Sequence, residues 1–317
     1  MPVNRNGFAA MLLTVPLSPD REEFSRPLTP GEYQELIYRL QHLEMNGPGE
    51  LLDMNIAQLM HTAGLTEEEA FRIYTLINRS VQMNYAVESF LAKGIRIVSC
   101  YDSGYPAPWK KKGELLPPVC FVCGNPGLAN TPCISIISIG GVKTTPEKRH
   151  AVEHLVHQCA ERGYTVITGG EAGISTVAAK AVAGCGGNLI EVLAGEMDQA
   201  LLKEPVRKML QEDRCAVYSM EHPQALTTVS HAIQRNKACF TLSDAVFIIN
   251  GDGKRGEMEA LNRRLCDWVY ALEEPALRGL ISRGAIPIGD LNAFDLRSAS
   301  ERWGSSRFEQ LSMLDRM

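Results

Sequence analysis

The sequence has no long apolar run, and this absence excludes a simple membrane protein. A helix that crosses a bilayer needs about 18 consecutive apolar residues, and the longest early apolar stretch, residues 8–17, is interrupted by Thr14 and Pro16. The small-residue cleavage site of a signal peptide is also missing, because the polar and charged residues 18–23 follow directly. We therefore expect a cytoplasmic protein with no membrane partner.

A strong excess of either charge is missing as well. The chain has 32 Lys and Arg against 37 Asp and Glu, a net charge of −5 over 317 residues. This balance excludes a globally basic coat for nucleic acid, but it allows a local basic cleft, because only the field near a site matters. The nine cysteines are an odd number spread over apolar segments. They fit reduced, buried thiols better than a disulfide framework.

The part after the N-terminal tail (residues 1–28) has the pattern of a small helical module, residues 29–94. Residues 29–32 and 66–69 are capping boxes, and the second begins a long helical pattern that reaches Leu91. Residues 59–70 resemble a helix-hairpin-helix, a shape that offers backbone N–H groups to a phosphate. Acidic residues crowd its second helix, which favours a module that only packs.

The middle of the chain alternates strands with helices. Four apolar runs, 134–139, 164–167, 189–193 and 245–249, are typical of buried parallel strands, and glycine turns and helical patterns separate them. Such repeats predict an α/β fold, a doubly wound, mostly parallel, Rossmann-like sheet. We assign residues 95–275 to this core and 276–317 to a short C-terminal tail that is too short for a winged-helix domain.

Glycine clusters follow two consecutive strands of this predicted sheet. They are Gly140-Gly141 and the turn of residues 168–173. Glycine lets the backbone turn sharply and approach a phosphate, and helix N-termini supply N–H donors. Neither cluster is a full GxGxxG motif and no Walker lysine follows, so each alone is consistent with a tight turn. Together they indicate a ligand that carries phosphate.

Three motifs in order carry a family resemblance. Residues 139–146 (IGGVKTTP), residues 168–175 (TGGEAGIS), and Arg235-Asn236-Lys237 followed by residues 242–246 (LSDAV) resemble the three signatures of the DprA/Smf family. The Tyr-Pro, Pro-Pro and Gly-Asn pairs at residues 105, 117 and 124 have the family's order and spacing. The resemblance covers roughly residues 29 to 272.

The resemblance implies a non-catalytic protein, often a homodimer, that binds single-stranded DNA. It also implies help in loading a RecA-type recombinase during natural transformation or recombination, with no cofactor, no metal and no catalytic residue. Among the expected DNA-phosphate contacts, those carried over from the family's motifs are Gly140, Gly141, Lys143, Thr168, Gly169, Gly170, Gly173, Arg235, Asn236 and Lys237. We add Lys254 and Arg255, on the loop after the last predicted strand, and Phe240 as a stacking ring, with burial in the core as its alternative.

Four residues depart from the family's pattern. Val142 stands in place of the first-motif arginine, Ser175 in place of the second-motif aspartate, and Ala179 in place of a following histidine. Lys237 keeps the charge of the third motif but loses the planar arginine fork. Each lost phosphate contact weakens binding and flattens its salt dependence.

Two other functions stay open. The loop of residues 251–259 partly matches the phosphoribohydrolase pattern, and Glu171, Glu257 and Glu259 are candidate carboxylates. The chain would then bind a nucleotide or hydrolyse its N-glycosidic bond. The third possibility is a partner of RecA whose own DNA site has decayed. The metal-like spacings of Cys120 with Cys123, and of the histidines on residues 150–157, are better explained by packing and an exposed helix face.

Overall fold

The computed structural model describes residues 4–20, 23–111, 116–138, 144–251, 261 and 265–303. It divides into two compact units. The first contains residues 1–127, 193–203 and 216–235, and the second contains residues 128–192, 204–215 and 236–317. The chain thus passes between the units several times. The module boundaries expected from the sequence, after residues 28, 94 and 275, stay predictions.

The first unit begins with short helices. They are α1 (Arg5–Thr14), α2 (Pro30–His42), the 3-10 helix η1 (Pro48–Asp53), α3 (Ile56–His61), α4 (Glu67–Ile77) and α5 (Ser80–Leu91). Both predicted capping boxes are confirmed, because Thr29 and Thr66 each exchange hydrogen bonds with the glutamate three residues later. The single long helix expected up to Leu91 is two helices, since the α-helical pattern is interrupted at Asn78 and Arg79.

Arg79 explains this interruption. Its side chain donates to the carbonyl oxygens of Leu12 and Val15 at 2.6–2.9 Å and pairs with Glu23 at 2.5 Å. It is 8% exposed, and burial lowers its pKa. Arg79, at the break between α4 and α5, therefore holds the end of α1, an element that the sequence patterns had not indicated.

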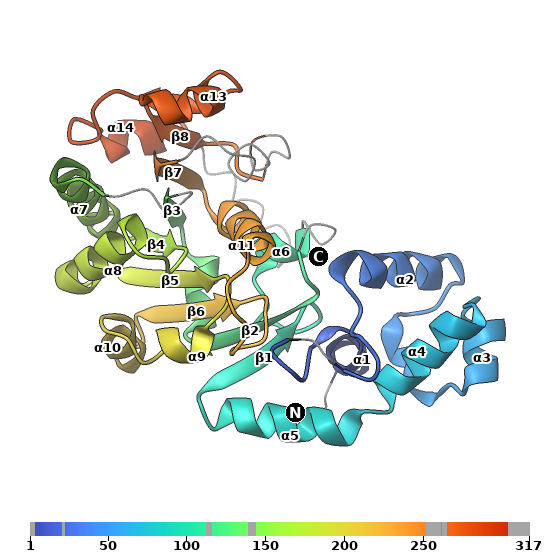
Figure 1. Ribbon diagram of the computed structural model, residues 1–317. Coiled ribbons are helices and arrows are strands. Elements are labelled where there is room, and N and C mark those ends of the chain that lie inside the picture. The colour runs from blue at the N-terminus through green and yellow to red at the C-terminus, as the bar shows by residue number, and fades with distance from the viewer. Residues whose placement is uncertain are drawn as a thin grey trace. The chain divides into compact units, whose positions relative to one another are not determined.

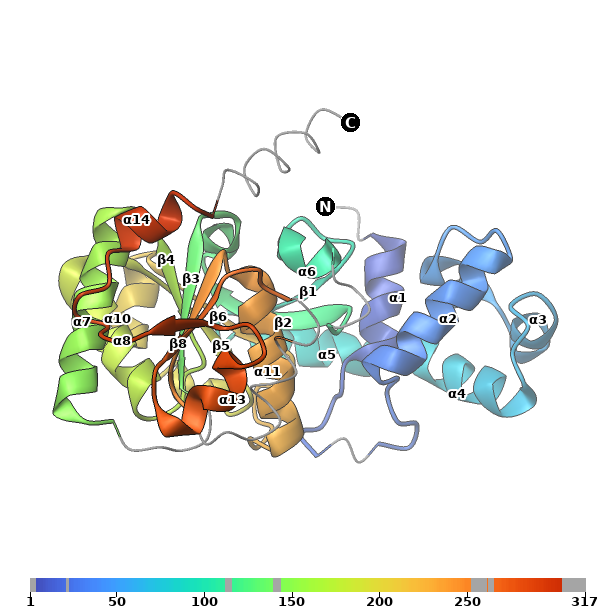
Figure 2. The ribbon, with the colours of Figure 1, turned by 90° about the horizontal axis from the view of Figure 1, so that it is seen from above.

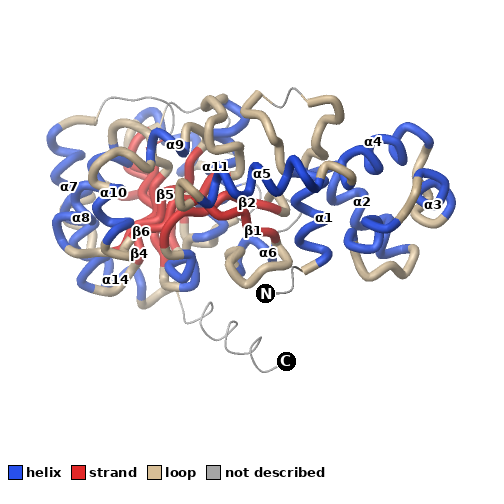
Figure 3. The backbone as a smooth tube through the Cα atoms, turned by 90° about the horizontal axis from the view of Figure 1, so that it is seen from below, coloured by secondary structure: helices blue, strands red, loops and turns tan. Residues whose placement is uncertain are grey.

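The strands of the first unit are antiparallel. They are β1 (Ile95–Ser99), β2 (Val119–Gly124) and β6 (Cys215–Ser219), and β2 pairs with both others. The helices α1 and α5 contact β1, and Figure 3 shows α5 running alongside it. The short helices α6 (Ala107–Lys111) and α9 (Met197–Ala200) complete this unit together with the first half of α11 (Val229–Leu242).

The second unit contains a parallel sheet. Its strands are β3 (Cys133–Ser138), β4 (Thr165–Thr168), β5 (Asn188–Leu193), β7 (Ala245–Asn250), β8 (Val269–Leu272) and β9 (Ile286–Ile288). Every pairing among them is parallel, in the order β5-β4-β3-β7-β8-β9. In chain order these strands read 3-2-1-4-5-6, the order of a Rossmann fold. The predicted fold class is confirmed.

Helices cover both faces of this sheet, as a doubly wound fold requires. On one face α7 (Pro146–Glu161) and α8 (Ile174–Cys185) pack together and contact β3 and β4, as Figure 1 shows. The other face receives the second half of α11, because Ser135 on β3 hydrogen-bonds to Ser243 and to the carbonyl of Cys239. Figure 2 shows α13 (Arg278–Ile281) on the same side as α11.

The segment after residue 275 is built into the second unit. It contains η4 (Pro275–Leu277), α13, β9 and α14 (Leu296–Ser300). The Trp303 indole donates to the Tyr270 hydroxyl at 3.0 Å, and Tyr270 stacks on Phe247 of β7 with ring centroids 4.9 Å apart. The remaining described elements are α10 (Val206–Gln211) and the 3-10 helix η3 (Pro126–Asn130). In the described part of the chain, no helix has both the length and the apolar character that a bilayer crossing requires.

Candidate functional site

The candidate site lies at the carboxyl edge of the parallel sheet. The strand order reverses at β3, with β4 on one side and β7 on the other. Ligands of open α/β sheets bind beyond the carboxyl ends of the strands at such a switch point. Ser138, Thr168 and Asn250 end β3, β4 and β7. The described residues that follow these three ends therefore define the site.

The turn after β4 places the N-terminus of helix α8 at this edge of the sheet. Gly170 and Gly173 have φ angles of +71° and +97°, a backbone conformation that other residues rarely adopt. Gly173 is the N-cap of α8 and supplies no side-chain cap. The first backbone amides of α8 thus keep their capacity to bind an anion. This is the geometry expected from the second motif.

Four buried polar atoms at this edge have no hydrogen-bond partner among the described residues. They are the hydroxyls of Thr144, Thr168 and Ser175 and the amide nitrogen of Asn250. Thr168, Ser175 and Asn250 are each 0% exposed. A buried polar group without a partner costs about 1–3 kcal/mol. A ligand that supplies those hydrogen bonds would recover this free energy.

Lys148 brings a positive charge to the same edge. It lies in the first turn of α7, where Thr145 caps the helix by accepting from the Lys148 backbone amide. Its ammonium donates to Asn250 Oδ1 at 2.5 Å and to Glu274 at 2.7 Å, and its side chain is 15% exposed. No sequence motif singled out Lys148, although the Thr-Pro helix start after the first motif fixes its position in that first turn.

The third motif lies on α11. Arg235 and Asn236 are buried, at 7% and 4% exposure, and Lys237 is half-buried. Helix α11 contacts β3 at Cys239. Lys237 precedes Cys239 by two residues, so it lies about 3 Å nearer the N-terminus of the helix, at a rise of 1.5 Å per residue. Phe240 is 0% exposed. Its ring therefore has the core placement that the sequence left as the alternative to base stacking.

The other expected contacts lie outside the described residues. They are Gly140, Gly141 and Lys143 of the first motif and Lys254 and Arg255 of the loop after β7. Val142, Glu257 and Glu259 belong to the same two segments. In the chain these segments directly follow β3 and β7, the two strands that border the switch point. Glu171 is described and half-buried in the turn before α8.

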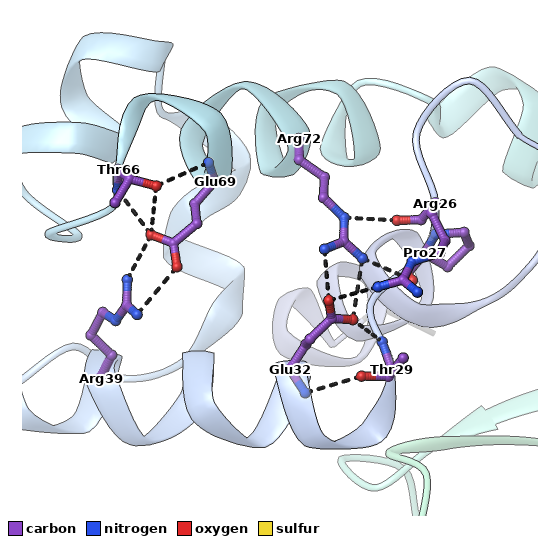
Figure 4. Close-up of polar contacts among 8 residues, drawn as sticks. All are labelled: Arg26, Pro27, Thr29, Glu32, Arg39, Thr66, Glu69 and Arg72. Atoms are coloured by element: carbon purple, nitrogen blue, oxygen red, sulfur yellow. Dashed lines mark hydrogen bonds and ion pairs between the residues drawn. The ribbon is translucent and has the colours of Figure 1, made fainter.

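In the helix-hairpin-helix-like segment, residues 59–70, the acidic side chain of Glu69 pairs with another helix of the protein. Gly64 has a φ angle of +65° between α3 and α4. At the start of α4, Thr66 accepts from the backbone amide of Glu69, and the Glu69 carboxylate forms a two-bond pair with Arg39 of α2. A second pair joins Glu32 to Arg72 (Figure 4). These contacts fit the packing role that the acidic residues favoured.

Thiol and metal chemistry receive no support from the described residues. All nine cysteines are free thiols, and burial raises the pKa of the Cys120 thiol well above its usual value. No group of three or more His, Cys, Asp and Glu side chains in the described part is arranged to hold a metal ion. The Cys120 and Cys123 spacing falls on β2, as expected for a packed strand.

Comparisons with known proteins agree with this geometry. Residues 96–267 match the family model described as DNA recombination-mediator protein A. DNA processing protein A (DprA) from Streptococcus pneumoniae is 19% identical over 85% of this chain and 94% of its own, with a TM-score of 0.57. This likeness shows a shared fold. No curated protein sequence matches significantly.

Two further solved structures have lower TM-scores. DNA processing protein A from Helicobacter pylori, described with a single-stranded DNA binding mode, is 20% identical over 59% of this chain and 88% of its own, with a TM-score of 0.47. The molybdenum cofactor carrier protein of Chlamydomonas reinhardtii is 19% identical over 54% and 98%, with a TM-score of 0.39.

Proposed function

Because this chain belongs to the DNA recombination-mediator protein A family, we propose that it binds single-stranded DNA without catalysing a reaction. The membership confirms the resemblance carried by the three motifs. We further propose that the bound strand is handed to a RecA-type recombinase, during DNA uptake or during recombination. The protein would act in the cytoplasm as a homodimer.

The observation that carries the proposal is the carboxyl edge of the parallel sheet. The donors there are the N-terminal amides of α8 and the ammonium of Lys148. Thr168, Ser175 and Asn250 add groups that can donate and that have no partner among the described residues. A phosphate oxygen is an acceptor that satisfies several such donors together. Internal pairing of Lys148 with Glu274 limits the positive charge, which suits a confined groove for one strand.

Titration of a fluorescent single strand at two salt concentrations tests the proposal. Binding should be tightest at about 50 mM salt and should fall steeply by about 200 mM, with a logarithmic slope of about 0.7 for each phosphate contacted. Absence of binding at about 50 mM salt would contradict the proposal. Unchanged affinity between the two concentrations would show that phosphates are not what the protein contacts.

Variants at the motifs assign the contacts. Arg235→Ala and Lys143→Ala should each weaken binding and lower the salt slope by about 0.7. Lys208→Ala removes an exposed lysine of α10, whose side chain is 66% exposed, and serves as the matched control. Because Arg235 is buried, Arg235→Lys provides a variant that keeps the charge. If both motif variants bind like the control, the site assignment is wrong.

A recombinase assay and a mass measurement test the finer claims. The protein should retain a RecA-type recombinase in a pull-down and shorten the lag before it assembles on a coated strand. Light scattering should give twice the mass of the chain. Retention of recombinase by a protein that retains no DNA would instead support a partner whose own DNA site has decayed.

Nucleotide binding is a second candidate, and the neutral donors favour it. Thr168, Ser175 and Asn250 would satisfy one phosphate group without an arginine. A mononucleotide should then compete with the single strand at equal phosphate concentration, whereas strand binding predicts that longer strands win strongly. Release of a free base from nucleoside monophosphates would establish hydrolysis in place of the non-catalytic function.

A further inference from the structure

Lys148 holds a carboxylate and an amide at the carboxyl edge of the parallel sheet. Asn250 ends β7, and Glu274 follows the last residue of the neighbouring strand β8 by two positions. All three residues belong to the second unit. The ammonium lies 2.5 Å from Asn250 Oδ1 and 2.6–2.7 Å from the two Glu274 carboxylate oxygens. The positive charge of Lys148 is therefore balanced by a negative charge before any ligand binds.

Glu274 does not use its side chain to cap the short helix that it begins. It is the N-cap residue of η4, yet its side chain makes no cap hydrogen bond. Its backbone is held, because its amide donates to the carbonyl of Leu272 and its carbonyl oxygen accepts from Leu277. The Glu274 side chain is 36% exposed, against 15% for Lys148. The carboxylate thus has access to water and can leave the ammonium while the backbone stays in place.

Asn250 keeps the ammonium in position when the carboxylate leaves. A lysine ammonium only donates hydrogen bonds, so the atom of Asn250 that it contacts is the amide oxygen. The amide nitrogen then lies on the other side of the planar group, where it is buried and has no hydrogen-bond partner among the described residues. An acceptor at this edge is therefore offered the ammonium and the amide together.

A phosphate and the Glu274 carboxylate compete for this ammonium. An ammonium has three donors in a tetrahedral arrangement, so two acceptors that lie about 2.8 Å from it are about 4.5 Å apart. Two unit negative charges at that separation near a protein surface repel each other by a free energy that corresponds to about tenfold or more in affinity. A phosphate therefore binds more tightly when Glu274 has turned away from Lys148.

We propose that Glu274 is an internal competitor of the bound strand, because its carboxylate occupies Lys148 in the free protein and a phosphodiester group of the strand displaces it. The inference rests on the proposed binding of single-stranded DNA. Lys148 is then the cation in contact with phosphate, and Glu274 is a positioning residue that acts through it. Exchange of one anion for another releases no counterion, so this contact adds little to the salt dependence. It also lowers the affinity, which eases release of the strand.

Glu274→Gln tests the competition. The glutamine oxygen still accepts from Lys148, but the side chain no longer cancels the positive charge. This variant should bind a deoxythymidine oligomer about tenfold more tightly at about 50 mM salt, and the logarithmic salt slope should be steeper by about 0.7. Glu274→Ala makes the same charge change without the hydrogen bond and should show the same two shifts. Urea unfolding checks that both variants are folded.

Glu212→Gln is the matched control. Glu212 also lies in the second unit, its side chain is 37% exposed, and it pairs with Arg214. Arg214 donates to the carbonyl of Gly187, the residue before β5 begins, so this pair lies at the opposite, amino edge of the sheet. The control removes the same charge from a similar ion pair. It should bind the strand with the affinity and salt slope of the wild type.

The double variant Lys148→Met with Glu274→Gln identifies the cation. Lys148→Met alone should weaken binding, because it leaves the carboxylate without its counter-charge at the site. In the double variant the salt slope should return to the wild-type value, since the two positions again carry no net charge. A role of Glu274 in folding alone predicts no such return.

The outcomes distinguish this proposal from the function on which it rests. Salt-dependent binding by the wild type with no gain in Glu274→Gln, or with an equal gain in Glu212→Gln, would overturn the competition and leave the strand-binding function in place. A steeper slope that persists in the double variant would overturn the assignment to Lys148. Failure of every protein to bind at about 50 mM salt would overturn both the competition and the function.

Discussion

For two buried serines of the second unit, we predict opposite effects of substitution by alanine on stability and on DNA binding. Ser175 in α8 and Ser135 in β3 are both 0% exposed. The Ser135 hydroxyl lies 2.6 Å from the Ser243 hydroxyl, whereas the Ser175 hydroxyl has no hydrogen-bond partner among the described residues. Ser135→Ala therefore removes an existing hydrogen bond, whereas Ser175→Ala removes a buried hydroxyl that has no partner among the described residues.

The magnitudes follow from the cost of burying a polar group. Ser135→Ala should lower the free energy of unfolding by about 1 kcal/mol, the net value of a typical hydrogen bond. Ser175→Ala removes a group whose unmet desolvation costs about 1–3 kcal/mol, so the protein should be as stable as the wild type or more so. A difference of 1 kcal/mol corresponds to about 2–4 °C in Tm for a domain of 150–250 residues.

The binding of a single strand should respond in the reverse order. A hydrogen bond to a charged phosphate contributes about 1.5–3 kcal/mol, so Ser175→Ala should weaken binding about ten- to a hundredfold. Ser135→Ala should leave binding unchanged, because Ser135 faces α11. Urea unfolding followed by circular dichroism gives the stabilities, and fluorescence anisotropy gives the affinities.

Two results would refute this reasoning. If Ser175→Ala destabilises the protein as much as Ser135→Ala does, the Ser175 hydroxyl already has a partner in the free protein. If Ser175→Ala is stable but binds DNA like the wild type, the partnerless hydroxyl is not part of the ligand site.

Two further predictions concern the helical part of the first unit. The hydrogen bond from Arg72 lowers the pKa of Glu32 from 4.5 to about 2, so this pair stabilises the folded state above about pH 4.5 and the contribution is lost as pH falls toward 2. Glu32→Gln should remove that part of the pH dependence in urea unfolding between pH 5 and pH 3, and an unchanged dependence would contradict it. Arg79→Met leaves Glu23 and two carbonyl oxygens without their partner and should cost about 3–5 kcal/mol. Glu23→Gln should cost less, since Arg79 keeps both carbonyls, and a loss below about 1 kcal/mol in Arg79→Met would show that α1 is held by other contacts.

Local sequence signals predicted the elements whose causes are local. The capping boxes at Thr29 and Thr66 fixed two helix starts, and β-branched runs marked β3, β4, β5 and β7 because buried parallel strands are apolar throughout. The break at Asn78 and Arg79 could not be predicted in this way. It depends on contacts of Arg79 with residues about 65 positions earlier in the chain.

The backbone conformation at the candidate site could be predicted in part from the sequence. The Gly170 and Gly173 turn was readable because positive φ angles favour glycine. Lys148 was not, since its partners, Asn250 at the end of β7 and Glu274 just after β8, lie more than 100 residues away in the chain.

The split of the first unit into three chain segments has a consequence for protein synthesis. Strand β2 pairs with β6, which is made about 90 residues later. At a translation rate of about 5–20 residues per second, that edge of β2 waits roughly 5–20 s for its partner. An apolar strand edge without a partner is a template for aggregation. That edge of β2 is thus open to wrong pairing while the parallel strands β3 to β5 are still being made.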